Sequence, residues 1–188
     1  MSGDARHDRS PDRTYDGAPS AELAQRARRI RWLVIDVDGV LTDGRIYYDA
    51  EGEALKAFDV KDGFAIVRAR REGLGVALLS GRESKATARR ARELEIDRVL
   101  LGHRDKTAVF EALLAEMELD AAEVAAIGDD VPDLGILERA GLSFAPADAV
   151  AEVRAACRVV LSAPGGRGAV REMVERLLAW REGHTAPS

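Results

Sequence analysis

Two carboxylates follow directly after an apolar stretch in the first quarter of the chain. The segment Trp32–Ile35 is apolar, and Asp36 and Asp38 come next, with Gly39 and Gly44 close behind. In a parallel α/β sheet, ligands bind at the carboxyl ends of the strands, and a glycine there lets the backbone turn away sharply. The pair therefore predicts a polar site at a strand end, where phosphoryl chemistry could take place.

Three further polar groups follow apolar runs later in the chain. Ser80 ends a second run and Lys106 opens a helix after a third, while Asp129, Asp130 and Asp133 follow a fourth. Right-handed crossovers bring the ends of neighbouring parallel strands to one edge of a sheet. We therefore expect all of these side chains to lie at the same edge as the opening pair.

Together these residues supply what phosphoryl transfer needs, namely a nucleophile, an acid and positive charge. Asp36 can attack phosphorus to form an acyl phosphate, and Asp38 can protonate the leaving alcohol and later accept a proton from water. Repulsion among the carboxylates and a dianionic phosphate calls for a hard cation. We predict Mg²⁺ at the side chains of Asp36 and Asp129 and at the backbone carbonyl of Asp38.

The remaining phosphate oxygens need hydrogen-bond donors. The Ser80 hydroxyl, the Lys106 ammonium and the backbone N–H groups near Gly81 are the predicted donors. Asp130 and Asp133 are expected to support the site.

Each of these residues also has a simpler structural explanation when taken alone. Asp38 is compatible with a turn, Ser80 with a helix cap and Lys106 with a solvated helix residue. Asp129 and Asp130 could cap the helix that follows them, where a carboxylate suits the helix dipole. Four such groups at four strand ends are harder to obtain by chance, which favours an active site.

The elements that must position these residues alternate along the chain. After a first strand beginning at Trp32, strands are predicted at 76–79, 98–101, 124–127, 142–144 and 159–161, and helices at 21–29, 63–72, 84–94, 106–117, 132–139, 150–155 and 169–180. Aromatic and β-branched residues at 46–48 and 54–58 flank a glycine-bearing turn, which predicts a β-hairpin. The alternation predicts an α/β fold with a doubly wound parallel sheet, Rossmann-like, and a projecting hairpin.

Length and composition limit the domain organisation, the binding partners and the compartment to be expected. The chain has 188 residues and a net charge of -5, and its arginines are interspersed with acidic residues, which argues against nucleic-acid binding. We predict one domain over 21–181, with a disordered tail over 1–20 and a flexible C-terminus over 182–188. The single cysteine, the absence of a stretch of about 20 apolar residues and the polar N-terminus predict a cytoplasmic protein without membrane contact.

The motifs resemble those of the haloacid dehalogenase superfamily over about 30–180. "DVDGVLTDG" is similar to its first motif, Ser80 to the second, Lys106 to the third and "GDDVPD" to the fourth. The resemblance implies Asp36 as nucleophile, Asp38 as acid and base, and a metal at Asp36, Asp38 and Asp129. The spacing leaves no room for the cap domains that many members carry, so a capless enzyme is expected.

A narrower resemblance rests on "DVKDG", "SGR" and "GGRGAVRE". These segments are similar to the phosphatase family that acts on 3-deoxy-D-manno-octulosonate 8-phosphate, a sugar acid of the lipopolysaccharide pathway. The resemblance implies a small-molecule substrate. The substrate contacts that it implies are Asp38, Asp59, Val60, Lys61, Asp62, Gly63, Arg82, Arg90 and Lys106.

The hairpin exposes more apolar surface than a small projection can bury alone, which predicts association. In the resembling family hairpins assemble a homotetramer, and the glycine-rich segment near Arg167 approaches a neighbouring active site. Arg167 is therefore a further candidate contact, across a subunit interface, for an anionic substrate group. The alternative is that Gly165, Gly166 and Gly168 only form a turn before the last helix.

Other functions remain open from the sequence. A nine-carbon keto-sugar-acid 9-phosphate is the main rival substrate. A signalling receiver domain also combines a phosphorylated aspartate, Mg²⁺, a hydroxyl and a lysine, but it places its paired acids on the first strand and its phosphoacceptor on a later one. An inactive scaffold is disfavoured because every side chain needed for catalysis is present.

Overall fold

A six-stranded parallel sheet organises the computed structural model, which describes residues 19–184. The strand order is β5-β4-β1-β6-β7-β8, and every pairing in this sheet is parallel. The bounds of these strands are β1 Trp32–Ile35, β4 Gly75–Ser80, β5 Arg98–Leu101, β6 Val124–Ile127, β7 Leu142–Ala145 and β8 Val159–Val160. The strands that carry the motifs are thus direct neighbours, with β1 between β4 and β6.

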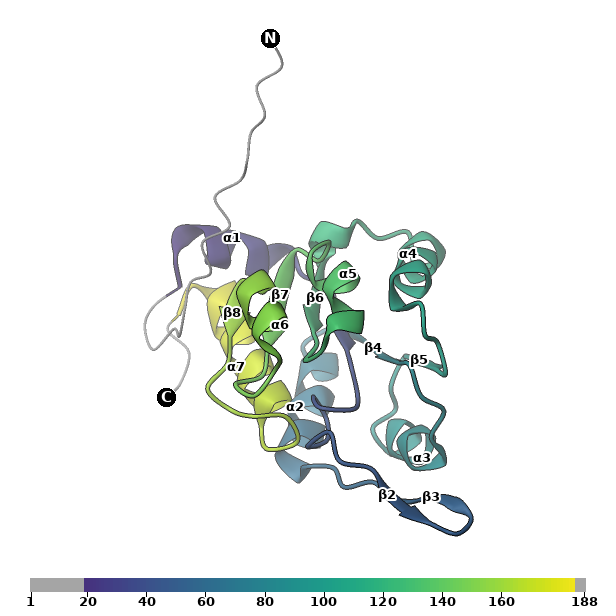
Figure 1. Cartoon of the computed structure of the whole chain (residues 1–188). Coiled ribbons are helices and arrows are strands. Elements are labelled where there is room, and N and C mark those ends of the chain that lie inside the picture. The colour runs from purple at the N-terminus through teal and green to yellow at the C-terminus, as the bar shows by residue number, and fades with distance from the viewer. Residues whose placement is uncertain (1–18, 185–188) are drawn as a thin grey trace.

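Helices cover both faces of the sheet (Figure 1). Their bounds are α1 Ala21–Arg29, α2 Val60–Arg71, α3 Lys85–Glu93, α4 Lys106–Glu116, α5 Leu134–Leu137, α6 Ala151–Ala156 and α7 Ala169–Glu182, with 3₁₀ turns η1 Ala121–Glu123 and η2 Val131–Asp133. One apolar cluster joins α1, α2, α3 and α7 to one face, and a second joins α4, α5 and α6 to the other. This is the doubly wound fold that the alternating pattern predicts.

Two helices differ from the sequence-based prediction by more than two residues at an end or in continuity. Helix α2 begins at Val60, three residues before the predicted start, because the Asp59 carboxylate caps it by accepting from the Lys61 N–H. The helix predicted over 132–139 is divided into η2 and α5. There Asp130 and Asp133 form a capping box around Pro132, and this tight turn replaces the first helical turn.

The hairpin consists of β2 Tyr47–Asp49 and β3 Gly52–Leu55, which pair antiparallel in a sheet of their own. It projects from the body of the molecule at the lower edge of Figure 1. Tyr48 and Leu55 are 63% and 58% exposed. The hairpin therefore leaves apolar side chains uncovered in the single chain, as its sequence predicts.

The sheet, its two helical layers and the hairpin confirm the predicted fold class. Within residues 19–184, no helix is both long and apolar enough to cross a membrane. The single-domain assignment stays a prediction. The tail predicted over 1–20 and the C-terminus predicted over 182–188 lie largely outside the described residues.

Candidate active site

The polar groups predicted at strand ends come together at one edge of the sheet. Ile35 is in register with Leu78 of β4 and with Ile127 of β6, so these strands end at the same level. Asp36 continues from β1, and its backbone N–H donates to the Ile127 carbonyl over 3.1 Å. Ser80 is the last residue of β4. The parallel register thus places the first and second motifs beside the end of β6.

Lys106 connects two of the carboxylates. Its Nζ lies 2.6 Å from Asp36 Oδ1 and 2.6 Å from Asp133 Oδ1, and all three side chains are buried. Burial by itself would lower the pKa of Lys106, but the charges of Asp36 and Asp133 outweigh it and raise that pKa. Lys106 therefore carries a positive charge inside the site.

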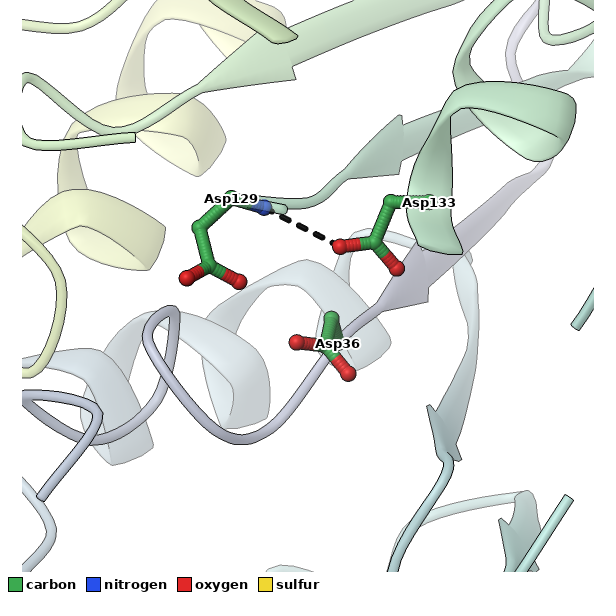
Figure 2. Close-up of side chains that lie close together, drawn as sticks. All are labelled: Asp36, Asp129 and Asp133. Atoms are coloured by element: carbon green, nitrogen blue, oxygen red, sulfur yellow. Dashed lines mark hydrogen bonds between the residues drawn. The ribbon is translucent and has the colours of Figure 1, made fainter. Parts of the chain in front are cut away.

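Three carboxylates cluster around this lysine. Oxygens of Asp36, Asp129 and Asp133 lie within 4.8 Å of one another, and Figure 2 shows the three side chains turned toward a common space. Burial, followed by the charge of Asp133, raises the pKa of Asp36 well above its ordinary value. The same two causes raise the pKa of Asp129 to about 6. One lysine thus faces three acidic groups, and their mutual repulsion disfavours full ionisation of the cluster unless a further cation is bound.

The donor set fits a divalent cation. Both oxygens of Asp133 already accept hydrogen bonds, Oδ1 from Lys106 and Oδ2 from the N–H groups of Asp129 and Asp130. In contrast, Oδ1 of Asp129 is buried and has no hydrogen-bond partner. Hard oxygen ligands of this kind suit Mg²⁺. Asp36 and Asp129 would hold the ion, and Asp133 would orient Lys106 and the loop after β6.

Gly39 of the first motif allows the loop after β1 to approach Asp129 closely. Gly39 has a φ of +90°, and a Cβ at this position would lie 1.9 Å from Asp129 Oδ2. A Cβ on Gly165 would lie 1.9 Å from the Gly39 carbonyl oxygen, and the Gly166 N–H donates to the Val40 carbonyl. The glycine-rich segment therefore forms a turn against the loop after β1 in its own chain, and Arg167 within that turn is exposed.

An open cavity lies above the cluster. The residues that line it are Asp36, Asp38, Gly44, Ser80, Gly81, Arg82, Arg104, Lys106, Asp129, Asp130, Pro132 and Asp133. This set contains every predicted catalytic, metal and phosphate-binding residue. The cations and backbone groups along its wall provide a surface complementary to a phosphate ester.

Several predicted substrate contacts do not line this cavity. The segment from Asp59 to Gly63 forms the start of α2, and the Asp62 carboxylate accepts from the backbone N–H groups of Gly168 and Arg171. Burial raises the pKa of Asp62 despite these bonds. Asp62 thus joins α2 to α7. Its contact with a substrate stays a prediction, as do those of Asp59, Val60, Lys61, Gly63, Arg90 and Arg167.

The structure adds residues that the sequence analysis does not select. The Thr42 hydroxyl accepts from the N–H groups of Gly39 and Gly44, so it fixes the loop after Asp38. Lys56, at the base of the hairpin, donates to Asp38 over 2.7 Å. Arg104 lines the cavity two residues before Lys106. The position of Thr42 inside the first motif is a signal that it belongs to the site. No such signal distinguishes Lys56 from other polar residues of the hairpin.

This fold and this cluster define the class of protein. A family model described as haloacid dehalogenase-like hydrolase matches residues 102–170, which include Lys106, Asp129 and Asp133. Curated relatives match more than four fifths of the chain. The chain belongs to the haloacid dehalogenase-like hydrolase family.

Within that family several relatives are named for one reaction. The chain is 44% identical over 157 residues to the 3-deoxy-D-manno-octulosonate 8-phosphate phosphatase KdsC of Haemophilus influenzae, covering 83% of this chain and 87% of the relative. It is 41% identical to KdsC of Escherichia coli K12, with 88% of each chain covered. A crystal structure of the phosphatase from Moraxella catarrhalis, in complex with magnesium ion, phosphate ion and KDO, is similar with a TM-score of 0.84 and 35% identity, over 87% of this chain and 94% of that one.

Proposed function

We propose that this protein is a Mg²⁺-dependent phosphatase that hydrolyses 3-deoxy-D-manno-octulosonate 8-phosphate to the free sugar acid and phosphate, in lipopolysaccharide biosynthesis. The observation that carries the proposal is the buried carboxylate of Asp36, which is bonded to Lys106, adjacent to Asp129 and part of the lining of an open cavity. The relatives named for this reaction, at 40% to 44% identity, support the substrate. When bound, Mg²⁺ supplies positive charge that draws the phosphate toward Asp36.

In the first step Asp36 acts as the nucleophile. One of its carboxylate oxygens attacks phosphorus, and the bond from phosphorus to the sugar oxygen breaks. Asp38 gives a proton to that leaving oxygen, so that a neutral alcohol departs. Lys106, the Ser80 hydroxyl and the N–H groups near Gly81 hold the other phosphate oxygens. The products of this step are the sugar acid and an aspartyl phosphate.

In the second step water releases the phosphate. Asp38, now ionised, accepts a proton from the water as its oxygen attacks phosphorus. The bond between phosphorus and the Asp36 oxygen breaks, and Asp36 returns to its carboxylate form. Lys106 keeps its bond to Asp36 and Asp133 in the resting state and is already in place for the next cycle.

Recognition of the sugar acid is assigned to cations at the rim of the cavity. Arg82 lines the cavity, and its Nη2 donates to the Tyr48 hydroxyl over 2.7 Å. The guanidinium is therefore oriented by the hairpin, and it is positioned to pair with an anionic group of the substrate. A nine-carbon sugar-acid 9-phosphate would present the same groups and remains the second candidate substrate.

Association and location belong to the same proposal. The exposed apolar side chains of the hairpin, which include Tyr47, Tyr48 and Leu55, support a homotetramer. In such an assembly Arg167 would reach a neighbouring site. The single cysteine, Cys157, is buried and free, which agrees with a reducing compartment such as the cytoplasm.

A panel of phosphate esters tests the substrate. With Mg²⁺ present, we expect kcat/KM for 3-deoxy-D-manno-octulosonate 8-phosphate to exceed that for simple alkyl phosphates by at least about 100-fold, because only the sugar acid engages the rim cations. Phosphate release is the measurement. Equal rates across the panel would contradict the eight-carbon assignment, and faster turnover of the nine-carbon ester would replace it.

Substitution of the nucleophile tests the chemistry. Asp36→Asn should abolish turnover, because an amide oxygen cannot form the aspartyl phosphate. Circular dichroism should show an unchanged fold, since Asn has nearly the same shape as Asp. Retained phosphatase activity in the purified variant would show that another group attacks phosphorus.

A further inference from the structure

Lys56 lies at the base of the hairpin and is not part of any motif considered above. Its side chain is only 1% exposed, although lysine is rarely fully buried without a partner. Nζ lies 2.7 Å from Asp38 Oδ1 and 3.4 Å from Glu53 Oε2. The ammonium group is therefore enclosed between one carboxylate of the active site and one of the hairpin.

The contact with Asp38 leaves the two oxygens of that carboxylate in different environments. Oδ1 accepts a charge-assisted hydrogen bond from Lys56, which fixes the orientation of the group. Oδ2 is buried and has no hydrogen-bond partner. Asp38 also lines the cavity above the carboxylate cluster. Oδ1 is thus anchored, and Oδ2 carries no hydrogen bond that would compete with proton transfer.

Glu53 anchors the lysine in turn. Its Oε1 accepts from the Ser84 hydroxyl over 2.5 Å, and the same hydroxyl accepts from the Thr87 N–H at the start of α3. Lys56 is consequently held by a chain of contacts that runs from the hairpin to a helix of the main body. A lysine held in this way has little rotational freedom, so its bond to Asp38 has a defined direction.

We propose that Lys56 is a positioning residue for Asp38, which it orients for proton transfer to the leaving oxygen. The inference rests on the proposed function, because it assumes the two-step hydrolysis described above. A displacement of about 1 Å in a group that transfers a proton can cost about 100-fold in rate. Lys56 acts through Asp38 and does not itself touch the substrate.

The dependence of the rate on the leaving group distinguishes this role from general structural support. An alkyl phosphate expels an alkoxide, which needs the proton of Asp38 as the bond breaks. The phenolate expelled from p-nitrophenyl phosphate is stable without a proton. Loss of the orientation of Asp38 should therefore slow formation of the aspartyl phosphate for alkyl esters and leave it much less affected for the aryl ester.

The test compares Lys56→Met with Lys85→Met, in the full-length protein with Mg²⁺. Lys85 is an exposed lysine at the start of α3, so its replacement controls for loss of one positive charge near the hairpin. For each variant, kcat and KM are measured with the sugar-acid phosphate, a simple alkyl phosphate and p-nitrophenyl phosphate. The ratio of alkyl to aryl kcat/KM is then compared with that of the unmodified protein.

We expect Lys56→Met to lower the alkyl-to-aryl ratio by about 10-fold to 100-fold, through kcat more than through KM, and Lys85→Met to leave it unchanged. An equal loss with both esters, or no loss, would overturn the proposal. If Lys56→Met does not fold, Lys56→Gln is measured in its place. Gln keeps a hydrogen-bond donor in the same space, so this variant should lower the alkyl-to-aryl ratio less strongly. An unchanged ratio in folded Lys56→Gln would also overturn it.

Failure of the proposed function gives a different pattern. If the unmodified protein does not prefer the sugar-acid phosphate, the substrate assignment is wrong. The positioning role is still tested by the ratio between the simple alkyl ester and the aryl ester, which does not involve the sugar.

Discussion

Single residues set the geometry of this site through close approach and through direct hydrogen bonds. The Asp129 carboxylate lies against the backbone of Gly39, where any side chain would collide with it. Asp133 uses both of its oxygens to hold Lys106 and the loop after β6. Asp36, Lys106 and Asp129 are therefore positioned before a substrate binds, which lowers the reorganisation needed during the proposed reaction.

Gly39→Ala tests this close approach. The new Cβ would lie 1.9 Å from Asp129 Oδ2, so Asp129 must move, and we expect activity to fall by about 100-fold. Gly73→Ala is the matched control, because Gly73 has a φ of +83° with nothing within 4 Å of its Cβ position. Both variants should lose about 1 to 2 kcal/mol of stability from backbone strain. Steady-state kinetics and thermal melts separate the two effects, and equal activity in both variants would contradict the role of Gly39.

Residues that belong to a sequence motif could be predicted as site residues. A residue that joins the site only through a tertiary contact could not. Asp36, Ser80, Lys106 and Asp129 were predictable because each follows an apolar run, and parallel strands bring such ends together. Lys56 has no such signal, since its bond to Asp38 depends on how the hairpin folds back over the loop.

At the scale of the elements, the hairpin is the part that the body of the molecule does not bury. It contributes Tyr48, which contacts Arg82 at the cavity, and Lys56, which contacts Asp38. Its outer face leaves Leu55 exposed. The same short element thus faces the active site with its polar groups and faces solvent with its apolar ones.

Leu55→Asp tests the proposed association through the hairpin. A charge on this face cannot be buried without a partner, so we expect the homotetramer to dissociate. Sedimentation velocity measures the outcome. Val99→Asp, at an exposed apolar position of β5 far from the hairpin in sequence, should leave the assembly unchanged. A monomer in the unmodified protein, or a tetramer in Leu55→Asp, would contradict the hairpin interface.

Sequence patterns located nearly all of the described elements but not every boundary. Strands β5 and β6 and helix α1 begin and end where the pattern predicts. The apolar pattern does not reveal the start of α2, because the Asp59 cap lies upstream of that pattern. It does not reveal η2 either, because the capping box interrupts what resembles one longer helix. Local side-chain bonds to the backbone decide such boundaries, and apolar periodicity does not record them.

At the scale of the whole molecule, the ionisation of the carboxylate cluster makes the free energy of unfolding depend on pH. Burial and the charge of Asp133 raise the pKa of Asp129 to about 6, above the value of about 3.9 that is usual for an unfolded chain. The folded protein therefore binds more protons than the unfolded chain between these values. In metal-free protein, the contribution of Asp129 to the free energy of unfolding is therefore present at low pH and is lost as the pH rises through about 6.

Metal-free protein should accordingly melt at a lower temperature at pH 8 than at pH 5. Added Mg²⁺ should raise the melting temperature more at pH 8, because the ion binds the ionised carboxylates and stabilises only the folded state. Asp129→Asn should reduce both effects, since it removes the titrating group. Thermal melts with a chelator and with Mg²⁺ provide the measurement, and identical pH dependence in Asp129→Asn and in the unmodified protein would contradict this explanation.

The turn at Gly165 and Gly166 has a consequence for how the enzyme is made. Its backbone packs against Gly39 and Val40, so the loop that carries Asp38 is supported by residues synthesised long after it. A ribosome releases the N-terminal part of a chain first, and contacts between distant segments form late. In a nascent chain, the loop that carries Asp38 therefore gains this support only after the segment before α7 has emerged.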